Sequence, residues 1–244
     1  MAGSGFGTNF RITTWGETHG AGVGVVVDGC PAGLPLERED VQKYLDRRKP
    51  GQSKYTTQRK EGDQVEILSG IFEGRTTGTP ISMVVYNKDQ RSKDYSNIKD
   101  IYRPGHADFT FDMKYGFRDY RGGGRSSGRE TIGRVAAGAV AAKVLKELGI
   151  EIKAYAKAIA GIEVSKDHFD FAEMNNNPFN MPDKEAAKLV QEKADQMIKE
   201  MDSIGGIIEC QITGMPVGIG ETVFDKLDAE LSKAIMSIGS VKGF

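Results

Sequence analysis

The sequence predicts an α+β fold in a single domain. Short β-branched runs and helical stretches occur together in the 244-residue chain, which is typical of a mixed class. They do not alternate in the strand–helix–strand rhythm of a parallel sheet, so an α+β or layered β-α-β arrangement is favoured over a Rossmann fold. We find no internal repeat, low-complexity tract or interdomain linker, and therefore expect one domain over residues 1–244.

Four segments have the pattern of strands. Residues 22–28, GVGVVVD, are β-branched and are closed by Gly29. Segments 65–71 and 80–86 have the same character and are separated by the turn-like EGRTTGT. Residues 207–213 form the fourth predicted strand.

Four other segments have the pattern of helices. Residues 38–48 form one that stops before a proline, and 131–148, rich in Ala and Val, form a mostly buried one. Residues 225–237 form a third. The strongest pattern covers 184–202, where apolar residues step by three and four along one face. That stripe consists of Ala187, Val190, Ala194, Met197 and Met201.

Composition excludes several classes of protein. The 33 basic and 34 acidic side chains give a net charge of −1, which argues against nucleic-acid binding driven by net charge. A mean hydropathy of −0.41 is typical of a soluble globular protein. No apolar run approaches the ~20 residues of a membrane span, and the N-terminal residues lack the apolar core of a signal peptide. We therefore expect a cytoplasmic protein, with Cys30 and Cys210 as reduced thiols.

Glycine and local charge indicate where a ligand binds. Glycine accounts for 31 residues, nearly twice the usual share of about 7%. Six basic residues and no acid lie between Arg47 and Lys60, and seven basic residues face four acids over 103–134. Residues 163–202 are acidic instead. This distribution predicts two basic loops that hold an anionic ligand and a solvated acidic flank.

The first candidate site is the stretch GETHG, which precedes the predicted strand 22–28. His19 lies beside Gly20, so little side-chain bulk keeps a ligand from its ring, which can exchange a proton near neutral pH. An ordinary exposed loop histidine explains the same pattern equally well.

The second candidate site is richer in chemistry. RPGHAD carries His106, and RGGGRSSGRE leads into the predicted helix 131–148. Three glycines followed by Arg125, Ser126 and Ser127 are typical of a phosphate cradle in which backbone N–H groups and the helix N-terminus converge. A flexible turn before a capped helix is the alternative. RGGGR also has some likeness to RNA-binding RGG segments, which makes RNA binding a weaker hypothesis.

Other constellations are missing from the sequence. There is no CxxC or HExxH pattern for a metal, so no metal is expected, and no GxSxG hydrolase elbow or Walker loop. We expect His168 to be a surface histidine and Trp15 to pack rather than to bind a ligand.

The motifs together resemble one family, chorismate synthase. GETHGAGVGVVVDGCPAG resembles its first signature, usually GESHG, with Thr18 for Ser. DRRKPGQSKYTTQRKEGDQVEILSGIFEGRTTGTPI is similar to the next block, and RPGHADFTFDMKYGFRDYRGGGRSSGRETIGRVAAGAVA to the long central signature. GIGETVFDKLDAELSKAIMSIGSVKGF resembles the segment before the family's VKG(V/F)EIG. The resemblance is colinear from about Phe10 to Phe244.

The sequence departs from the family pattern at three further places. Gly239 and Ser240 replace the commoner Asn-Ala, and Lys54 stands where many members have Arg. The family continues past Phe244 through a Lys-Pro-Thr flavin segment and an Arg-His-Asp motif. We therefore expect a fragment or a truncated form that lacks part of the flavin site and one acidic catalytic residue.

The resemblance implies a β-α-β sandwich and a lyase of the shikimate pathway, which serves aromatic amino acid biosynthesis. Such enzymes convert 5-enolpyruvylshikimate 3-phosphate to chorismate by anti-1,4-elimination of phosphate. They need reduced FMN without net redox change, and NADPH is a candidate reductant of that flavin. A homotetramer is also implied. The alternative is a non-catalytic form of the same fold that binds the anion or the flavin.

The resemblance also assigns roles to residues. It implies that His19 gives a proton to the departing phosphate and that His106 acts on the N1 side of the reduced flavin. The positions that match the flavin contacts are Arg125, Ser126, Ser127, Gly239 and Ser240. The positions that match contacts to the substrate or to NADP are Arg48 and Lys54, with Arg129 and Arg134 as further substrate-anion candidates.

Overall fold

The computed structural model describes residues 3–56, 61–88 and 98–244. The chain divides into two compact units, and helices and strands occur in both, which confirms the predicted α+β class. The first unit comprises Met1–Pro50, Arg59–Leu148 and Pro216–Phe244. The second comprises Gly51–Gln58 and Gly149–Met215. That the chain folds as one domain stays a prediction.

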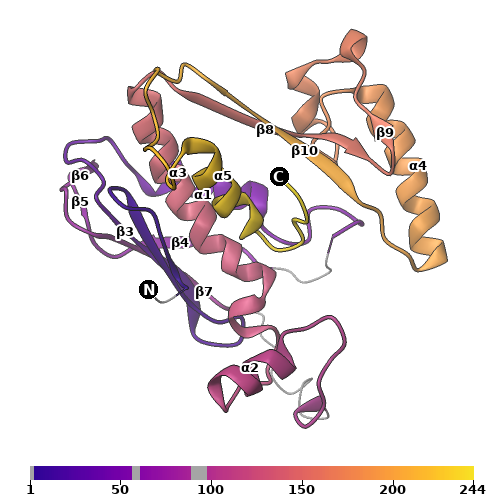
Figure 1. Cartoon of the computed structure of the whole chain (residues 1–244), viewed down its shortest axis with the longest axis horizontal. Helices are drawn as coiled ribbons and strands as arrows, with labels where there is room; N and C mark the ends of the chain where they lie inside the picture. The colour runs from indigo at the N-terminus through magenta and orange to yellow at the C-terminus, as the bar shows by residue number, and fades with distance from the viewer. Residues whose placement is uncertain (1–2, 57–60, 89–97) are drawn as a thin grey trace. The chain divides into compact units, whose positions relative to one another are not determined.

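The first unit is built on a five-stranded antiparallel sheet with the order β1-β2-β3-β7-β4 (Figure 1). Its strands are β1 (Gly5–Phe6), β2 (Arg11–Gly16), β3 (Gly22–Asp28), β4 (Val65–Ile67) and β7 (Ile81–Tyr86). The middle strand β3 pairs Val25 with Met83 and Val27 with Ile81 of β7. Because side chains alternate along a strand, these cross-strand pairs share one buried face. The predicted strand 22–28 is confirmed, and 80–86 is confirmed with its start one residue later.

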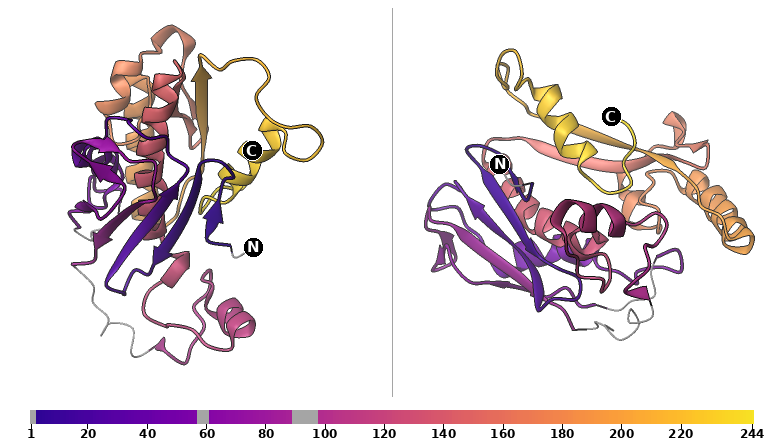
Figure 2. Two further views of the ribbon diagram at one scale, coloured as in Figure 1. Left: turned by 90° about the vertical axis from the view of Figure 1, so that its left-hand side faces the viewer. Right: turned by 60° about the horizontal axis from the view of Figure 1, so that its bottom comes forward.

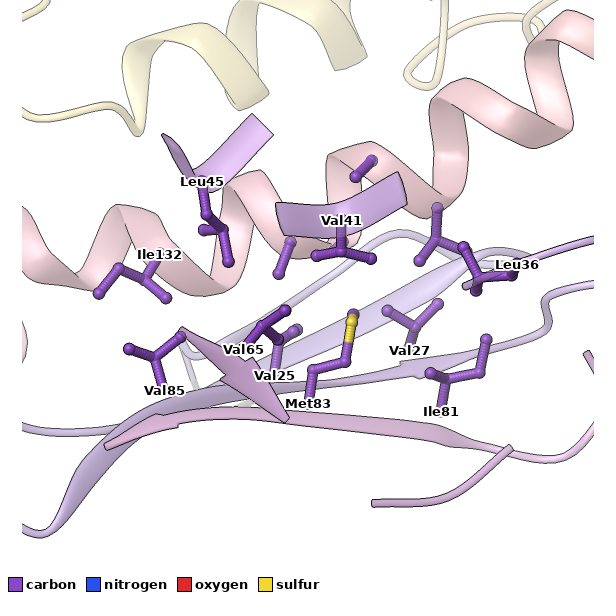
Figure 3. Close-up of a cluster of buried hydrophobic side chains, with 14 of the residues drawn as sticks. Val25, Val27, Leu36, Val41, Leu45, Val65, Ile81, Met83, Val85 and Ile132 are labelled. Atoms are coloured by element: carbon purple, nitrogen blue, oxygen red, sulfur yellow. The ribbon is translucent and has the colours of Figure 1, made fainter. Parts of the chain in front are cut away.

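Helices α1 (Arg38–Arg48) and α3 (Thr131–Glu147) contact each other and cover that face (Figure 2). Figure 3 shows the resulting core, in which Val41 and Leu45 of α1 meet the valine-rich strands. Ile132 extends the core from the first turn of α3. Both helices were predicted from the sequence, and α3 ends one residue earlier than expected.

The predicted strand 65–71 is wrong in extent, because the pairing breaks in its middle. β4 ends at Ile67, and Gly70 has a φ of +82°, a left-handed conformation that interrupts an extended chain. The chain then enters the short hairpin of β5 (Ile71–Phe72) and β6 (Arg75–Thr76). The Ser69 hydroxyl accepts from the Ser82 N–H and donates to the Pro80 carbonyl, which holds this break against β7.

Two helices of the first unit lie outside its core. α5 (Leu227–Met236) confirms the predicted helix 225–237 within narrower bounds. α2 (Asp108–Tyr115) was not predicted, because its eight residues carry no apolar stripe. Two 3₁₀ turns, Gly124–Ser126 and Gly128–Glu130, follow the glycine triplet and lead into α3.

The second unit has a three-stranded antiparallel sheet with the order β10-β8-β9. Its elements are β8 (Glu151–Ile159), β9 (Ile162–Glu163), β10 (Gly206–Thr213), α4 (Lys184–Glu200) and the 3₁₀ turns Lys166–His168 and Phe171–Asn175. Strand β8 was not predicted. Helix α4 buries Ala187, Val190 and Ala194 of its predicted stripe, but the prediction that Met201 belongs to this stripe is wrong. Its φ of +54° makes it the left-handed C-cap, where its side chain is 94% exposed.

Trp15 packs against the sheet, as the sequence suggested. It lies opposite Gly24 in the β2–β3 register, and a Cβ at position 24 would come within 2.4 Å of its ring. Glycine is therefore required there for the indole to lie across β3. Cys30 and Cys210 are free thiols. Among the described helices, none is long and apolar enough to cross a membrane.

We expect Leu45→Ala to lower the free energy of unfolding by about 2–5 kcal/mol, because it removes a fully buried side chain from the core. The matched control is Leu68→Ala, whose side chain is 56% exposed and whose loss we expect to cost no more than about 0.5 kcal/mol. Chemical denaturation of both variants measures the difference. Equal losses would contradict the core described here.

Candidate functional site

His19 is buried, not an exposed loop histidine. Its residue is 7% exposed, and it lies in the turn between β2 and β3. Gly122 lies directly against its ring: a Cβ at position 122 would be 2.5 Å from His19 Cδ2 and 2.9 Å from Nε2. Gly122 also has a φ of +68°, so glycine meets two requirements at once. The first glycine of RGGGR is therefore part of the wall around this imidazole.

The rest of the RGGGRSS turn is tied to strand β2 by Arg125. Its guanidinium donates to the carbonyl oxygens of Gly16 and Thr14, both at 3.1 Å, and to the Thr14 hydroxyl at 2.7 Å. The Ser127 hydroxyl accepts from the Arg129 N–H and caps the second 3₁₀ turn. Arg125, a residue that matches the family's flavin contacts, thus holds the turn in place with its guanidinium.

A second polar cluster is centred on Glu130. Its carboxylate accepts from the Thr14 hydroxyl at 2.8 Å and from Arg134 Nε at 2.8 Å, and Arg125 lies 3.7 Å away. Arg134 also donates to the Ser237 hydroxyl at 2.6 Å. Arg125 and Arg134, both proposed from the sequence as ligand contacts, are therefore joined through the Glu130 carboxylate.

A third cluster buries two further arginines on Asp63. The Asp63 carboxylate accepts from Arg48 Nη1 at 2.6 Å and from Arg129 Nη1 at 3.0 Å, and its side chain has no exposed surface. Arg48 also donates to the Thr131 hydroxyl and the Gly128 carbonyl at the start of α3. Arg129 is 5% exposed, and its Nη2 has no hydrogen-bond partner among the described residues. Two guanidinium groups therefore share one buried carboxylate.

The loop that carries His106 is fixed by Arg103 and Asp108. Arg103 donates from Nε and Nη2 to the Asp108 carboxylate, both at 2.8 Å, and from Nη2 to the Gly122 carbonyl at 2.7 Å. These bonds hold the pKa of Asp108 well below its usual value. The exposed His106 ring places Nδ1 3.0 Å from the Pro104 carbonyl. Because a carbonyl only accepts, Nδ1 carries the proton there and Nε2 is left to take up or release one.

Asp119 lies between His106 and Gly122 in the sequence, and its carboxylate interacts electrostatically with His19. Arg121 donates to its carboxylate at 2.6 and 2.8 Å and thereby lowers the pKa of Asp119, to which the charge of His19 adds a smaller effect. The carboxylate therefore stays ionised near neutral pH.

A cavity of about 900 Å³ opens in the first unit. Six of the residues singled out from the sequence line it: Arg125, Ser126, Ser127, Arg134, Gly239 and Ser240. Aromatic side chains of the α2 region, Phe111, Tyr115 and Phe117, line it as well. The cavity therefore offers cationic and hydroxyl groups together with aromatic rings. His19, His106, Arg48 and Arg129 are not among its lining residues.

Lys54 belongs to the second unit. Its ammonium lies 2.7 Å from Asp195 Oδ1, and this hydrogen bond raises the pKa of Lys54. Arg48 and Lys54, expected to act as a pair, thus have separate carboxylate partners in separate units. Arg59 and Lys60 of the same basic run lie outside the described residues. His168 is a surface residue whose Nδ1 lies 3.4 Å from Glu185.

Sequence reasoning missed the acidic and amide partners of the site. Asp63, Asn87 and Glu130 organise the arginines, yet the first two lie far from them in sequence. Asp63 carries one local signal, a φ of +42° after a glycine, but this signal does not predict an arginine partner. Only the fold brings these groups together.

The chain is similar to known chorismate synthases. A family model described as chorismate synthase matches residues 10–244. The chain is 70% identical to the chorismate synthase of Lachnospira eligens and 64% identical to that of Agathobacter rectalis, over all 244 residues. It spans about two thirds of the length of these relatives, 67% and 66%. A crystal structure of a chorismate synthase superposes with a TM-score of 0.77 at 31% identity, covering 97% of this chain and 67% of the other.

We expect Gly122→Ala to destabilise the protein more than Gly124→Ala. Both glycines have positive φ, +68° and +52°, so each substitution carries a conformational penalty of about 1–2 kcal/mol. Only the methyl group at position 122 meets the His19 ring, since nothing lies within 4 Å of a Cβ at position 124. Overpacking adds about 1–3 kcal/mol to the first variant. Thermal unfolding compares the two, and equal losses would show that Gly122 does not support His19.

Asp108→Asn is expected to lower the free energy of unfolding at neutral pH by about 3–5 kcal/mol, because it removes the buried carboxylate that forms an ion pair with Arg103 through two hydrogen bonds. The folded-state pKa of Asp108 is lower than its unfolded value of about 3.9, so its stabilisation is present above that pH and is lost as pH falls. The difference between wild type and variant should therefore shrink below about pH 4.

The control is Asp28→Asn, which breaks a pair whose side chains are 59% and 41% exposed. Such a pair contributes about 1 kcal/mol or less. Unfolding curves over a pH series test both variants. A loss for Asp108→Asn that stays constant into the acid range would contradict the ion pair as its cause.

Proposed function

The chain belongs to the chorismate synthase family, and we propose that it converts 5-enolpyruvylshikimate 3-phosphate to chorismate by anti-1,4-elimination of phosphate. In that role it is a carbon–oxygen lyase acting on a phosphate, at the last step of the shikimate pathway. The observation that carries the proposal is the single cavity that is lined by every residue matching the family's flavin contacts within this chain. It supports a ligand that is both anionic and aromatic.

The cavity fits FMN in size and in chemistry. Its volume of about 900 Å³ lies within the usual range of about 300–1,000 Å³ for small-molecule sites. Arg134 and the hydroxyl groups of Ser126 and Ser127 suit the phosphate and ribityl oxygens, and Phe111, Tyr115 and Phe117 suit a flat ring. When bound, reduced FMN supplies the transient electron that the elimination needs. NADPH as its reductant is a further part of the proposal.

The Asp63 cluster fits an anionic substrate. Arg48 and Arg129 share the Asp63 carboxylate, and Arg129 Nη2 is buried without a described hydrogen-bond partner. An unsatisfied buried charged donor is costly, by about 1–3 kcal/mol or more, so an incoming phosphate or carboxylate oxygen would stabilise it. We assign this subsite to Arg48 and Arg129. Lys54 is proposed as a further contact, and its support is the family resemblance alone.

The two histidines supply and hold protons. We assign to His19 the donation of a proton to the departing phosphate, and the support for this role is the family resemblance. His106 holds one proton on Nδ1 against Pro104, so Nε2 is the atom that protonates or hydrogen-bonds the N1 side of the flavin. A homotetramer and a cytoplasmic location complete the proposal, and their support is likewise the resemblance.

We expect His19→Ala and His106→Ala each to lower turnover by about 10²-fold or more, the loss typical of a proton donor. Phosphate release and chorismate absorbance are followed anaerobically with reduced FMN and 5-enolpyruvylshikimate 3-phosphate. His168→Ala is the matched control, because that histidine is exposed in the second unit and should leave the rate unchanged.

Wild-type rates in both site variants would overturn the assigned roles. Binding of FMN and substrate without phosphate release, in the unsubstituted protein, would support the non-catalytic alternative. Failure to bind either ligand would contradict the proposed function as a whole.

A further inference from the structure

Every polar group of the Asn87 side-chain amide is hydrogen-bonded, either to the turn that carries His19 or to Arg129. Its Nδ2 donates to the carbonyl oxygens of Glu17 and Gly20, both at 2.9 Å, and these carbonyls bracket the histidine. Its Oδ1 accepts from Arg129 Nε at 3.1 Å. The Asn87 backbone N–H adds a bond to the Ala21 carbonyl at 3.0 Å. An asparagine side chain has two N–H donors and one carbonyl oxygen, so this amide is engaged at every group.

Other hydrogen bonds among the described residues also hold this loop. Gly20 N–H donates to the Glu17 carbonyl at 3.1 Å, which closes the turn on itself, and the Thr18 hydroxyl lies 3.5 Å from the Gly124 carbonyl. Asn87 stands just after β7, the strand that pairs with β3, so its own position is set by the sheet. The amide therefore anchors the turn that carries His19 to the rigid part of the unit.

We propose that Asn87 is the positioning residue of His19 and joins it to the arginine subsite. One guanidinium, Arg129, binds Asn87 through Nε and Asp63 through Nη1, and it directs its remaining Nη2 to no described partner. An anion held at Nη2 and the imidazole of His19 are thus connected through a single amide. This inference rests on the proposed function for the role of His19 but not for the geometry.

Only a neutral amide satisfies this arrangement. Aspartate has the same shape and keeps an acceptor for Arg129, but it replaces both donors by an oxygen that would face two carbonyl oxygens. Leucine removes the donors and the acceptor together. Asn87→Asp therefore removes the two bonds to the His19 turn and adds a negative charge beside Arg129, whereas Asn87→Leu removes both sets of bonds without adding a charge.

The test is the ring ¹H–¹⁵N NMR signal of His19 in labelled protein, which does not require turnover. The signal is assigned by its loss in His19→Gln, and the His106 and His168 signals serve as internal references. Asn87→Asp and Asn87→Leu should both move or broaden the His19 signal and leave His168 in place. An unchanged His19 signal in Asn87→Asp would overturn the proposal.

Asn177 provides a matched control in the second unit. Its Nδ2 likewise donates to two carbonyl oxygens, those of Glu173 and Met181, both at 2.8 Å. Asn177→Asp should lower the melting temperature to a similar extent and leave the His19 signal unchanged. A shift of the His19 signal in this control would show that general loosening, and not the Asn87 amide, is responsible.

Two further measurements keep the proposal falsifiable if a variant does not fold. In the unsubstituted protein both Asn87 side-chain amide protons should exchange slowly with solvent, and exchange as fast as that of an exposed asparagine would contradict the bonds. Where turnover is present, Asn87→Asp should lower kcat by about 10²-fold, the effect of a misplaced catalytic group, and Asn177→Asp should not. A displaced His19 signal in a protein without turnover would support the positioning role and contradict the proposed function.

Discussion

The Asp63 carboxylate is the contact on which the candidate site depends. It is buried between Arg48 at the end of α1 and Arg129 in the 3₁₀ turn before α3, so it joins the two helices that cover the sheet. Buried charges are tolerated when they are paired and hydrogen-bonded. Removal of this carboxylate would take a hydrogen-bond acceptor from both guanidinium groups at once.

The Glu130 carboxylate likewise holds arginine side chains in place, in the polar cluster between strand β2 and helix α3. It receives Arg134 of α3 and the Thr14 hydroxyl of β2, with Arg125 nearby. The arginines of the RGGGRSSGRE segment are thus paired with three carboxylates: Arg121 with Asp119, Arg125 with Glu130 and Arg129 with Asp63. Much of the local positive charge predicted from the sequence is therefore compensated by acids that also fix the fold.

Hydrophobic periodicity predicted the elements that make the core, and it failed where other forces decide the structure. Val23, Val25 and Val27 of β3 are buried, and so are Ala187, Val190 and Ala194 of the apolar stripe on α4. Helix α2 has no stripe and begins at Asp108, whose carboxylate is fixed by Arg103, so a tertiary ion pair sets its start. The break after Ile67 depends on a left-handed glycine, which pattern analysis treated as part of a strand.

The sequence predicted the candidate site only in part. Glycine, histidine and arginine gathered in two segments, and the structure places both segments around Gly122. Their partners could not be found from the sequence, because Asp63 and Asn87 act across 66 and 42 residues when they bind Arg129. Residue type predicts which groups carry chemistry, whereas only the fold decides which acid or amide neutralises or orients them.

The contact between Gly122 and the His19 ring makes the two positions interdependent in sequence change. A side chain at position 122 and an imidazole at position 19 compete for the same space, since they would lie 2.5 Å apart. A smaller residue at position 19 would vacate that space and remove the steric part of the constraint on position 122, leaving the left-handed backbone. A lineage that lost the histidine would consequently keep only the backbone constraint at the first glycine of the triplet, and any side chain acquired there would obstruct a return to histidine.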